Sequence, residues 1–218
     1  MRAKPTSQQR SQQKRDRILT AMDALLLRKS FAEISVADLA AKAKVAQATI
    51  YQRFSNADAT ASVLMELYFR HVEAWARRKR QSPRAESLFE ALVTIAGDAH
   101  DQVGALGYVM RPAYLYSRHR PDRAGKEWAR LEQVALDGFK TFLHQWSAQI
   151  RVGDIDHAAA LICYLFNFML LGPLLHGEEM RRSRLGSRKQ FAEALASLAH
   201  RYLTCGEHAA GTRAVGDS

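Results

Sequence analysis

Apolar side chains recur at helical spacing along most of this chain, and this periodicity limits its fold more than any other feature. The alternation of apolar and polar residues that is typical of strands is rare. The sequence therefore predicts an all-α fold of about nine helices. They are expected at 14–28, in a short helix opened by Ser35, at 47–54, from 55–58 to about 80, and at roughly 84–102, 105–118, 122–151, 156–175 and 187–204. Gly172 and Pro173 are expected to kink the eighth of these helices or to end it early.

Positive charge is concentrated in the N-terminal third of the chain. The 218 residues carry a formal net charge of +10. Residues 1–80 hold 16 Lys and Arg against 7 Asp and Glu, a net +9, whereas residues 81–218 hold 16 against 15, a net +1. Such a distribution favours a polyanionic partner for the first third alone. The hydrophobic content of 47% excludes a wholly disordered chain.

Residues 35–54 have the layout of a helix-turn-helix motif. Ser35, with Asp38 three residues later, resembles a capping box that opens a short helix. A tight turn follows, and a second helix buries Ile50 and Phe54 while it exposes a polar face. That face comprises Gln47, Ala48, Thr49, Tyr51, Gln52 and Arg53. In a major groove such Gln and Thr side chains can bond base edges, and flanking Tyr and Arg can reach phosphates. The alternative is that these are two short helices of an all-helical core.

The same region carries a set of residues that is specific in combination. The set consists of Arg17-Ile18-Leu19, Ala24-Leu25, Phe31, Ser35-Val36, Leu39-Ala40, Ala43-Lys44-Val45, the run from Ala48 to Phe54, and Ser55-Asn56-Ala57-Asp58. It resembles the tetracycline-repressor (TetR) family of bacterial transcription regulators over about a fifth of the chain. The resemblance implies a three-helix DNA-binding head, a fourth connecting helix, and a larger helical body that dimerises and binds a small-molecule effector.

The resemblance also implies roles for single residues. Gln47 and Thr49 match base-contacting positions, and Tyr51 matches a tyrosine that contacts phosphate. Ser35 matches a helix cap that also touches the DNA backbone. The expected DNA-binding residues are completed by Lys44, Ala48, Gln52 and Arg53.

Four positions depart from the family pattern. Ser30 and Lys44 stand where the family usually has Gly, Ala46 replaces a Ser or Thr cap, and Ala57 replaces a Lys that contacts phosphate. A left-handed conformation at Lys44 costs on the order of 1 kcal/mol, and the missing cap about as much again. These departures bear on the stability of the turn and on one phosphate contact.

The expected domains are a basic, disordered arm at 1–13, the helix-turn-helix head at 14–57, an effector-binding and dimerisation body at 58–206, and a disordered tail at 207–218. The arm and the start of the first helix hold Arg2, Lys4, Arg10, Lys14, Arg15 and Arg17. Two interpretations of the arm remain open: it follows the minor groove or the phosphates, or it is a solvated tail. The cluster at 77–80 is expected to be a solvated helix end.

Residues 158–175 form an almost uninterrupted apolar run, for which two interpretations also exist. The run is at the lower edge of the length that crosses a bilayer. Its marginal length, Asn167 in its middle, the Gly172-Pro173 pair and the lack of a second such run favour a buried helix of a dimer core. TetR-like proteins commonly pair their last two helices with those of a partner subunit, and we expect the same homodimer here, with no membrane involved.

The effector pocket is expected among the aromatic residues of the body. The candidates are Trp75, Met110, Tyr114, Trp128, Phe139, Phe142, Phe166 and Asn167. Asn167 is the most informative of them, because an amide in the middle of a core needs a hydrogen-bond partner. The composition of the set favours a small apolar or aromatic effector.

These observations together predict a bacterial, cytoplasmic, nucleoid-associated regulator that binds double-stranded DNA at a palindromic operator and is released from it by the effector. The alternative is an architectural or cell-cycle factor with the same head and no small ligand. No HExxH, GxSxG, P-loop or GxGxxG motif occurs, so we expect no enzymatic activity and no cofactor. Cys163 and Cys205 form no CxxC pair, and no metal site is expected. The first 17 residues lack the apolar segment of a secretory signal.

Overall fold

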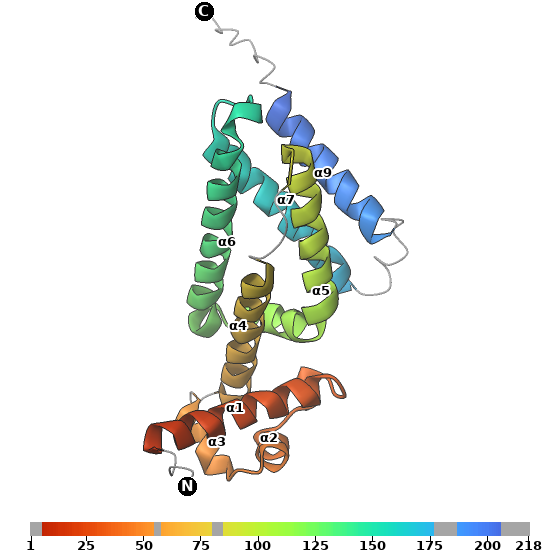
Figure 1. Cartoon of the computed structure of the whole chain (residues 1–218). Coiled ribbons are helices and arrows are strands. Elements are labelled where there is room, and N and C mark those ends of the chain that lie inside the picture. The colour runs from red at the N-terminus through yellow and green to blue at the C-terminus, as the bar shows by residue number, and fades with distance from the viewer. Residues whose placement is uncertain (1–5, 55–57, 80–84, 177–186, 206–218) are drawn as a thin grey trace, which may run out of the picture. The chain divides into compact units, whose positions relative to one another are not determined.

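A computed structural model describes residues 6–54, 58–79, 85–176 and 187–205 of the chain. Within these ranges it contains eight α-helices and no strand, so the predicted all-α class is confirmed (Figure 1). The chain divides into two compact units, one made of residues 1–82 and 104–128 and the other of residues 83–103 and 129–218. This division differs from the expected boundary at 57, because the first unit includes the fourth helix and half of the fifth.

The first unit is built on a three-helix head. Its elements are α1 (Ser7–Leu26), a 3₁₀ turn (Phe31–Glu33), α2 (Val36–Ala43), α3 (Gln47–Arg53), α4 (Ala59–Lys79), the second half of α5 (Leu88–His119) and a π turn (Pro121–Gly125). Met22 of α1, Leu39 of α2 and Ile50 of α3 are fully buried. Each of these residues lies on the apolar face of its own helix. Burial of the three faces against one another stabilises the short helices.

The start of α1 corrects the expected disordered arm. The helix begins at Ser7, because Thr6 and Gln9 form a reciprocal capping box. The Thr6 hydroxyl accepts from the Gln9 amide at 3.2 Å, and the Gln9 side chain accepts from the Thr6 amide at 2.8 Å. This box satisfies two amides that a helix start leaves unbonded. Residues 7–13 are therefore helical, whereas residues 1–5 of the expected arm and the expected tail at 207–218 lie outside the described residues.

The second unit has its own core. It comprises the first half of α5, α6 (Lys126–Gln145) from residue 129 onward, a 3₁₀ turn (Ser147–Gln149), α7 (Ile155–His176) and α9 (Arg188–Thr204). Leu92, Leu143 and Leu195, from three of these helices, are at most 2% exposed. Arg188 at the start of α9 donates two hydrogen bonds to Asp101 of α5, at 2.6 and 2.8 Å, and this pair joins the two helices at the edge of the core.

Three helix boundaries differ from the sequence-based prediction. The helices expected at 84–102 and 105–118 form the single helix α5, since Gly104 is tolerated at an exposed helical position. The helix expected at 122–151 is shorter, because a π turn precedes it and a 3₁₀ turn follows it. An early end at Gly172 and Pro173, one of the two outcomes expected there, is wrong, because α7 continues to His176.

Candidate DNA-binding site

The helix-turn-helix begins with a capping box at α2. The Ser35 hydroxyl accepts from the Asp38 amide at 3.1 Å, and the Asp38 carboxylate accepts from the Ser35 amide at 2.9 Å. The hydrogen bonds from Ser35, together with Lys29 at 3.3 Å, lower the pKa of Asp38 to about 2. Asp38 is thus ionised at neutral pH and faces the positive end of α2. The predicted role of Ser35 as a cap is confirmed.

The turn between α2 and α3 has a left-handed residue at Lys44, the position where the family usually has Gly. Lys44 has φ 55° and ψ 51°, the only positive φ at a non-glycine position among the described residues. The amide of Val45 reaches back to the carbonyl of Ala40 at 3.0 Å, which closes the end of α2. Ala46 then precedes α3 without a side-chain cap. The turn therefore tolerates backbone strain at Lys44 and lacks one stabilising hydrogen bond at Ala46.

Replacing Lys44 with glycine is expected to stabilise the protein by on the order of 1 kcal/mol, because glycine adopts the left-handed conformation without the Cβ clash. The melting temperature measured by circular dichroism should rise. Lys42→Gly is the matched control: Lys42 lies within α2, where glycine should lower the melting temperature. An unchanged or lower melting temperature for Lys44→Gly would show that the turn gains nothing from glycine.

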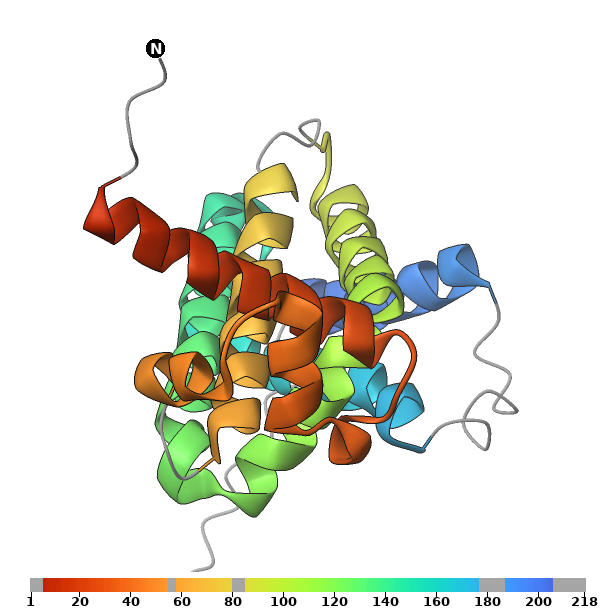
Figure 2. The same cartoon turned by 90° about the horizontal axis from the view of Figure 1, so that it is seen from below.

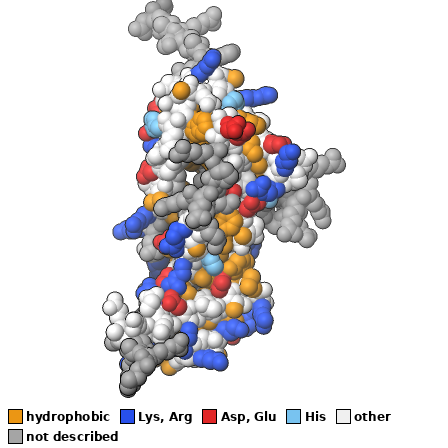
Figure 3. Space-filling model, viewed as in Figure 1, with side chains coloured by type: hydrophobic (Ala, Val, Ile, Leu, Met, Phe, Trp, Pro, Cys, Tyr) orange, Lys and Arg blue, Asp and Glu red, His pale blue; other side chains and the backbone are white. Residues whose placement is uncertain are grey.

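Helix α3 separates a buried face from an exposed one. Ile50 is fully buried and Phe54, directly after the helix, is 5% exposed. The opposite side carries exposed Gln47, Ala48 and Gln52, with Tyr51 43% exposed. Thr49 is half-buried at the edge of this face. In the view of Figure 3, Lys and Arg side chains lie on the surface over α1, α2 and α3.

Arg53 differs from its expected orientation. Its Nη1 atom donates to the Ser11 hydroxyl of α1 at 2.6 Å, so in this structure its guanidinium group lies against α1. The structure therefore brings six of the eight predicted DNA-binding residues to the exposed parts of the motif, with Thr49 and Arg53 half-buried. The exposed six are Ser35, Lys44, Gln47, Ala48, Tyr51 and Gln52.

Several polar contacts join α1 to α4 and α5. Sequence periodicity does not reveal these contacts. Arg15 forms two hydrogen bonds with Glu66, and Arg70 pairs with Asp16 at 2.7 Å. Asp23 of α1 accepts from the Tyr108 hydroxyl of α5 at 2.5 Å and lies 3.0 Å from Nε2 of His71 of α4. Burial and the Asp23 carboxylate both raise the pKa of Tyr108, so this hydroxyl keeps its proton.

The eight candidate effector residues fall into the two units. Trp75, Met110, Tyr114 and Trp128 belong to the first, and Phe139, Phe142, Phe166 and Asn167 to the second. In the first unit the Trp128 ring stacks on Tyr68 at 5.2 Å and meets the edge of Tyr114 at 5.4 Å. In the second unit Phe139 contacts Phe142 at 5.7 Å and Phe166 at 6.5 Å. Each unit thus has an aromatic cluster.

Asn167 does not lie in the core of the single chain. Its side chain is exposed, and Nδ2 donates to the carbonyl of Cys163 one turn earlier at 3.0 Å. Asn167 therefore satisfies its amide within its own helix, next to the exposed Phe168. The apolar run around Asn167 predicts a core position for this amide, because the sequence does not show which side of α7 is covered.

Helix α7 has an uncovered apolar face. Leu161 is 38% exposed, Tyr164 69%, Leu165 47% and Phe168 70%, and these residues are three or four apart. The neighbouring α9 exposes Leu198 (63%) and Tyr202 (41%). The segment Ile155–Gly172 is long and apolar enough to cross a membrane, and 22% of it is buried within the chain. One helix of this kind is also typical of a subunit interface.

Comparison with known proteins gives the head a family. Residues 18–59 match the family model of the bacterial regulatory proteins, tetR family. A search of curated protein sequences found no match. The whole fold is similar to the secondary repressor NalD from Pseudomonas aeruginosa, with 17% identity, a TM-score of 0.60, and 89% of this chain and 98% of that one covered.

Two structures of regulators called FadR have the same fold. The fatty acid degradation regulator FadR from Bacillus halodurans is 16% identical with a TM-score of 0.58, and the alignment covers 91% of this chain and 97% of that one. The transcriptional regulator FadR from Bacillus subtilis, in complex with stearoyl-CoA, is 17% identical with a TM-score of 0.50, with 90% and 99% covered.

The capped α2, the left-handed turn and the half-exposed α3 define a helical protein with a helix-turn-helix head. The family model covers this head, so residues 18–59 match the tetR family of bacterial regulatory proteins, as the sequence pattern predicted.

Proposed function

We propose that this protein is a transcriptional regulator that binds a palindromic operator in the bacterial cytoplasm, with α3 in the major groove. The observation that carries the proposal is the polar, exposed face of α3 on a helix whose other face is fully buried at Ile50. Gln47 and Thr49 can bond base edges, and Tyr51 and Lys44 can bond phosphates. Ser35, Ala48, Gln52 and Arg53 complete the proposed interface.

Selection of bound sequences from a pool of random duplexes tests this function. We expect enrichment of an inverted repeat, because two copies of one head read two equal half-sites. Recovery of sequences without a shared motif would contradict specific binding and would favour a purely electrostatic contact.

The proposed DNA-binding unit is a homodimer formed through α7 and α9. The apolar face on α7, made of Leu161, Tyr164, Leu165 and Phe168, has no cover within the described residues of this chain. A second copy that covers this face would remove it from water, which is the main driving force of such interfaces. The same contact would hold two heads at a fixed spacing, roughly 34–36 Å for successive major grooves.

A small apolar or aromatic effector would act on the dimer through the body. The aromatic clusters around Trp128 and around Phe139 support this proposal, because aromatic side chains are typical of ligand pockets. An effector that binds more tightly to a dimer whose two heads are not spaced to match the two half-sites would release the protein from the operator. The protein would then act as a repressor.

The first turns of α1 add a second surface to the proposed DNA interface. Arg10, Lys14 and Arg17 are exposed and lie four and three residues apart, so they share one face of the helix. Ser11 and Arg15 face the other way, toward Arg53 and Glu66. Figure 2 shows that the start of α1 projects past α2 and α3. This stripe is well placed to contact phosphates that flank a half-site.

Replacing Arg10, Lys14 and Arg17 together with glutamine should weaken DNA binding and reduce its salt dependence. The slope of log K against log salt concentration should become less steep by about two to three, since each phosphate contact contributes about 0.9. A triple change of the exposed Lys126, Arg130 and Arg151 to glutamine alters net charge equally and is the control. Equal slopes for wild type and the α1 variant would eliminate this contact.

A further inference from the structure

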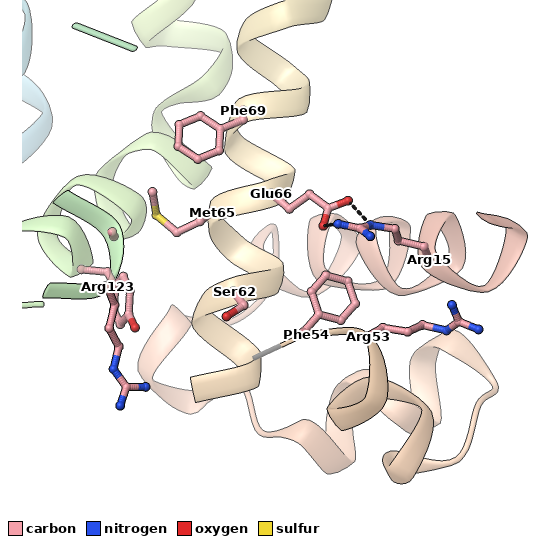
Figure 4. A pocket seen from close by; sticks show the side chains of 10 residues that line it. Arg15, Arg53, Phe54, Ser62, Met65, Glu66, Phe69 and Arg123 are labelled. Carbon is pink, nitrogen blue, oxygen red and sulfur yellow. Dashed lines mark hydrogen bonds and ion pairs between the residues drawn. The ribbon is translucent and has the colours of Figure 1, made fainter. Parts of the chain in front are cut away.

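A cleft of about 570 Å³ opens within the first unit, among α1, the end of α3, α4, α5 and the π turn. Its apolar wall is formed by Phe54, Met65, Phe69 and Ala124. Its polar lining includes three arginines, Arg15, Arg53 and Arg123, against the single carboxylate of Glu66. Figure 4 shows Arg123 and Arg53 on opposite sides of Ser62 and Phe54 in this view. The volume is within the range of small-molecule sites, about 300–1,000 Å³.

The charges on the lining do not cancel. Arg15 and Glu66 neutralise each other through two hydrogen bonds, at 2.6 and 2.5 Å, and the Arg15 guanidinium lies 5.5 Å from the centre of the Phe54 ring. Arg53 has a neutral partner, the Ser11 hydroxyl. Arg123 lies 3.6 Å from the carboxylate of Asp122, which is 62% exposed to water. A positive surplus therefore remains at Arg53 and, more weakly, at Arg123.

Arg53 also has a buried donor without a partner. Its Nε atom is shielded from solvent, and no acceptor bonds it among the described residues. An unsatisfied buried donor is destabilising by roughly 1–3 kcal/mol, and more when the group is charged. An anionic oxygen at this position would satisfy the donor and balance the charge.

We infer that this cleft binds a small amphipathic anion, with an acidic head at Arg53 and an apolar chain along Phe54, Met65 and Phe69. A carboxylate, rather than a neutral polar head, fits the positive surplus of the lining. Tyr116 already has Asp58 as a hydrogen-bond partner, so Arg53 is the main anchor for the acidic head. Arg123 adds electrostatic attraction for the head from the opposite side of the cleft. The site is separate from the aromatic clusters of Trp128 and Phe139.

The position of the cleft connects it to the DNA interface. Arg53 is the last residue of α3, the helix that carries Gln47 and Thr49. An anion bound to Arg53 holds this end of α3 against α1 and keeps its guanidinium from DNA phosphates. The binding site stands on the geometry of the cleft, whereas this consequence for DNA rests on the proposed function.

Titration calorimetry of the full chain with decanoate and with decanol, in the absence of DNA, tests the site. Decanoate should bind at least tenfold more tightly than decanol, because only the anion balances the positive charge of the arginines. Arg53→Gln should weaken decanoate binding about 10- to 100-fold, the value of one charged hydrogen bond. Arg53→Lys keeps the charge but lacks the Nε donor, and it should recover only part of the affinity.

A second variant keeps the test independent of any folding defect at Arg53. Ser62→Trp fills the cleft from α4 and should abolish decanoate binding, whereas Arg28→Gln, an exposed change outside the cleft, should leave it unchanged. Circular dichroism confirms that each variant is folded. Equal binding of decanol and decanoate, or wild-type affinity in both Arg53→Gln and Ser62→Trp, would overturn the proposal, and neither outcome depends on whether the protein binds an operator.

Discussion

Glutamate in place of Phe168 is expected to convert the protein from a dimer to a monomer and to lower its operator affinity by about 10²–10⁴-fold. Phe168 is 70% exposed in the single chain and lies one turn after Tyr164 and Leu165 on the apolar face of α7. In a dimer built on this face the glutamate would be buried without a partner, which is strongly unfavourable. A monomer loses the gain in affinity that comes from joining two heads. Sedimentation velocity measures the first effect and a binding titration on a palindromic duplex the second.

Val134→Glu is the matched control for this change. Val134 is an apolar side chain on α6 with a similar exposure of 62%, but it lies outside the face of α7 and α9. This variant should remain dimeric and should bind the operator as the wild type does. A Phe168→Glu protein that sediments as a dimer would place the subunit contact elsewhere.

Alanine at Gln47 or at Thr49 is expected to relax the preference for particular bases by about 1–3 kcal/mol at each half-site. The reason is that these side chains bond base edges in the proposed complex, so only the discrimination at the contacted base pair is lost. Tyr51→Phe should instead weaken binding to all sequences alike, because a lost phosphate contact carries no sequence information. Titration of each variant against the selected operator and against its single-base variants separates the two effects.

Gln133→Ala is a control for these variants, because Gln133 is exposed on α6, outside the helix-turn-helix. It should bind every duplex as the wild type does. An unchanged base preference in both the Gln47 and the Thr49 variants would contradict the proposed orientation of α3.

The head was well predicted because its structure is determined by local signals. The Ser35 cap and the left-handed turn at Lys44 depend on residues within a few positions of one another. The buried positions of Ile50 and Phe54 also follow from the spacing within one short helix. Hydrogen bonds of this range leave a pattern in the sequence that can be interpreted without knowledge of the rest of the fold.

The body was predicted less well because its contacts are distant in sequence. Tyr108 and Asp23 are 85 positions apart, and no periodicity indicates that they meet. Asn167 was expected in a core because apolar residues surround it in the sequence, yet the structure exposes that side of α7. Glycine was also a weak predictor of helix ends, since α5 continues through Gly104 and α7 through Gly172. In each case tertiary packing, rather than local preference, decides the outcome.

Chemical footprinting of guanine N7 on the selected operator tests whether two copies of α3 lie in the major groove, because this atom is exposed there. We expect two patches of protection, one helical turn apart, and loss of part of each patch in the Thr49→Ala variant. Protection of one patch only, or of minor-groove atoms with guanine N7 fully reactive, would contradict the proposed binding of two copies of α3 in the major groove.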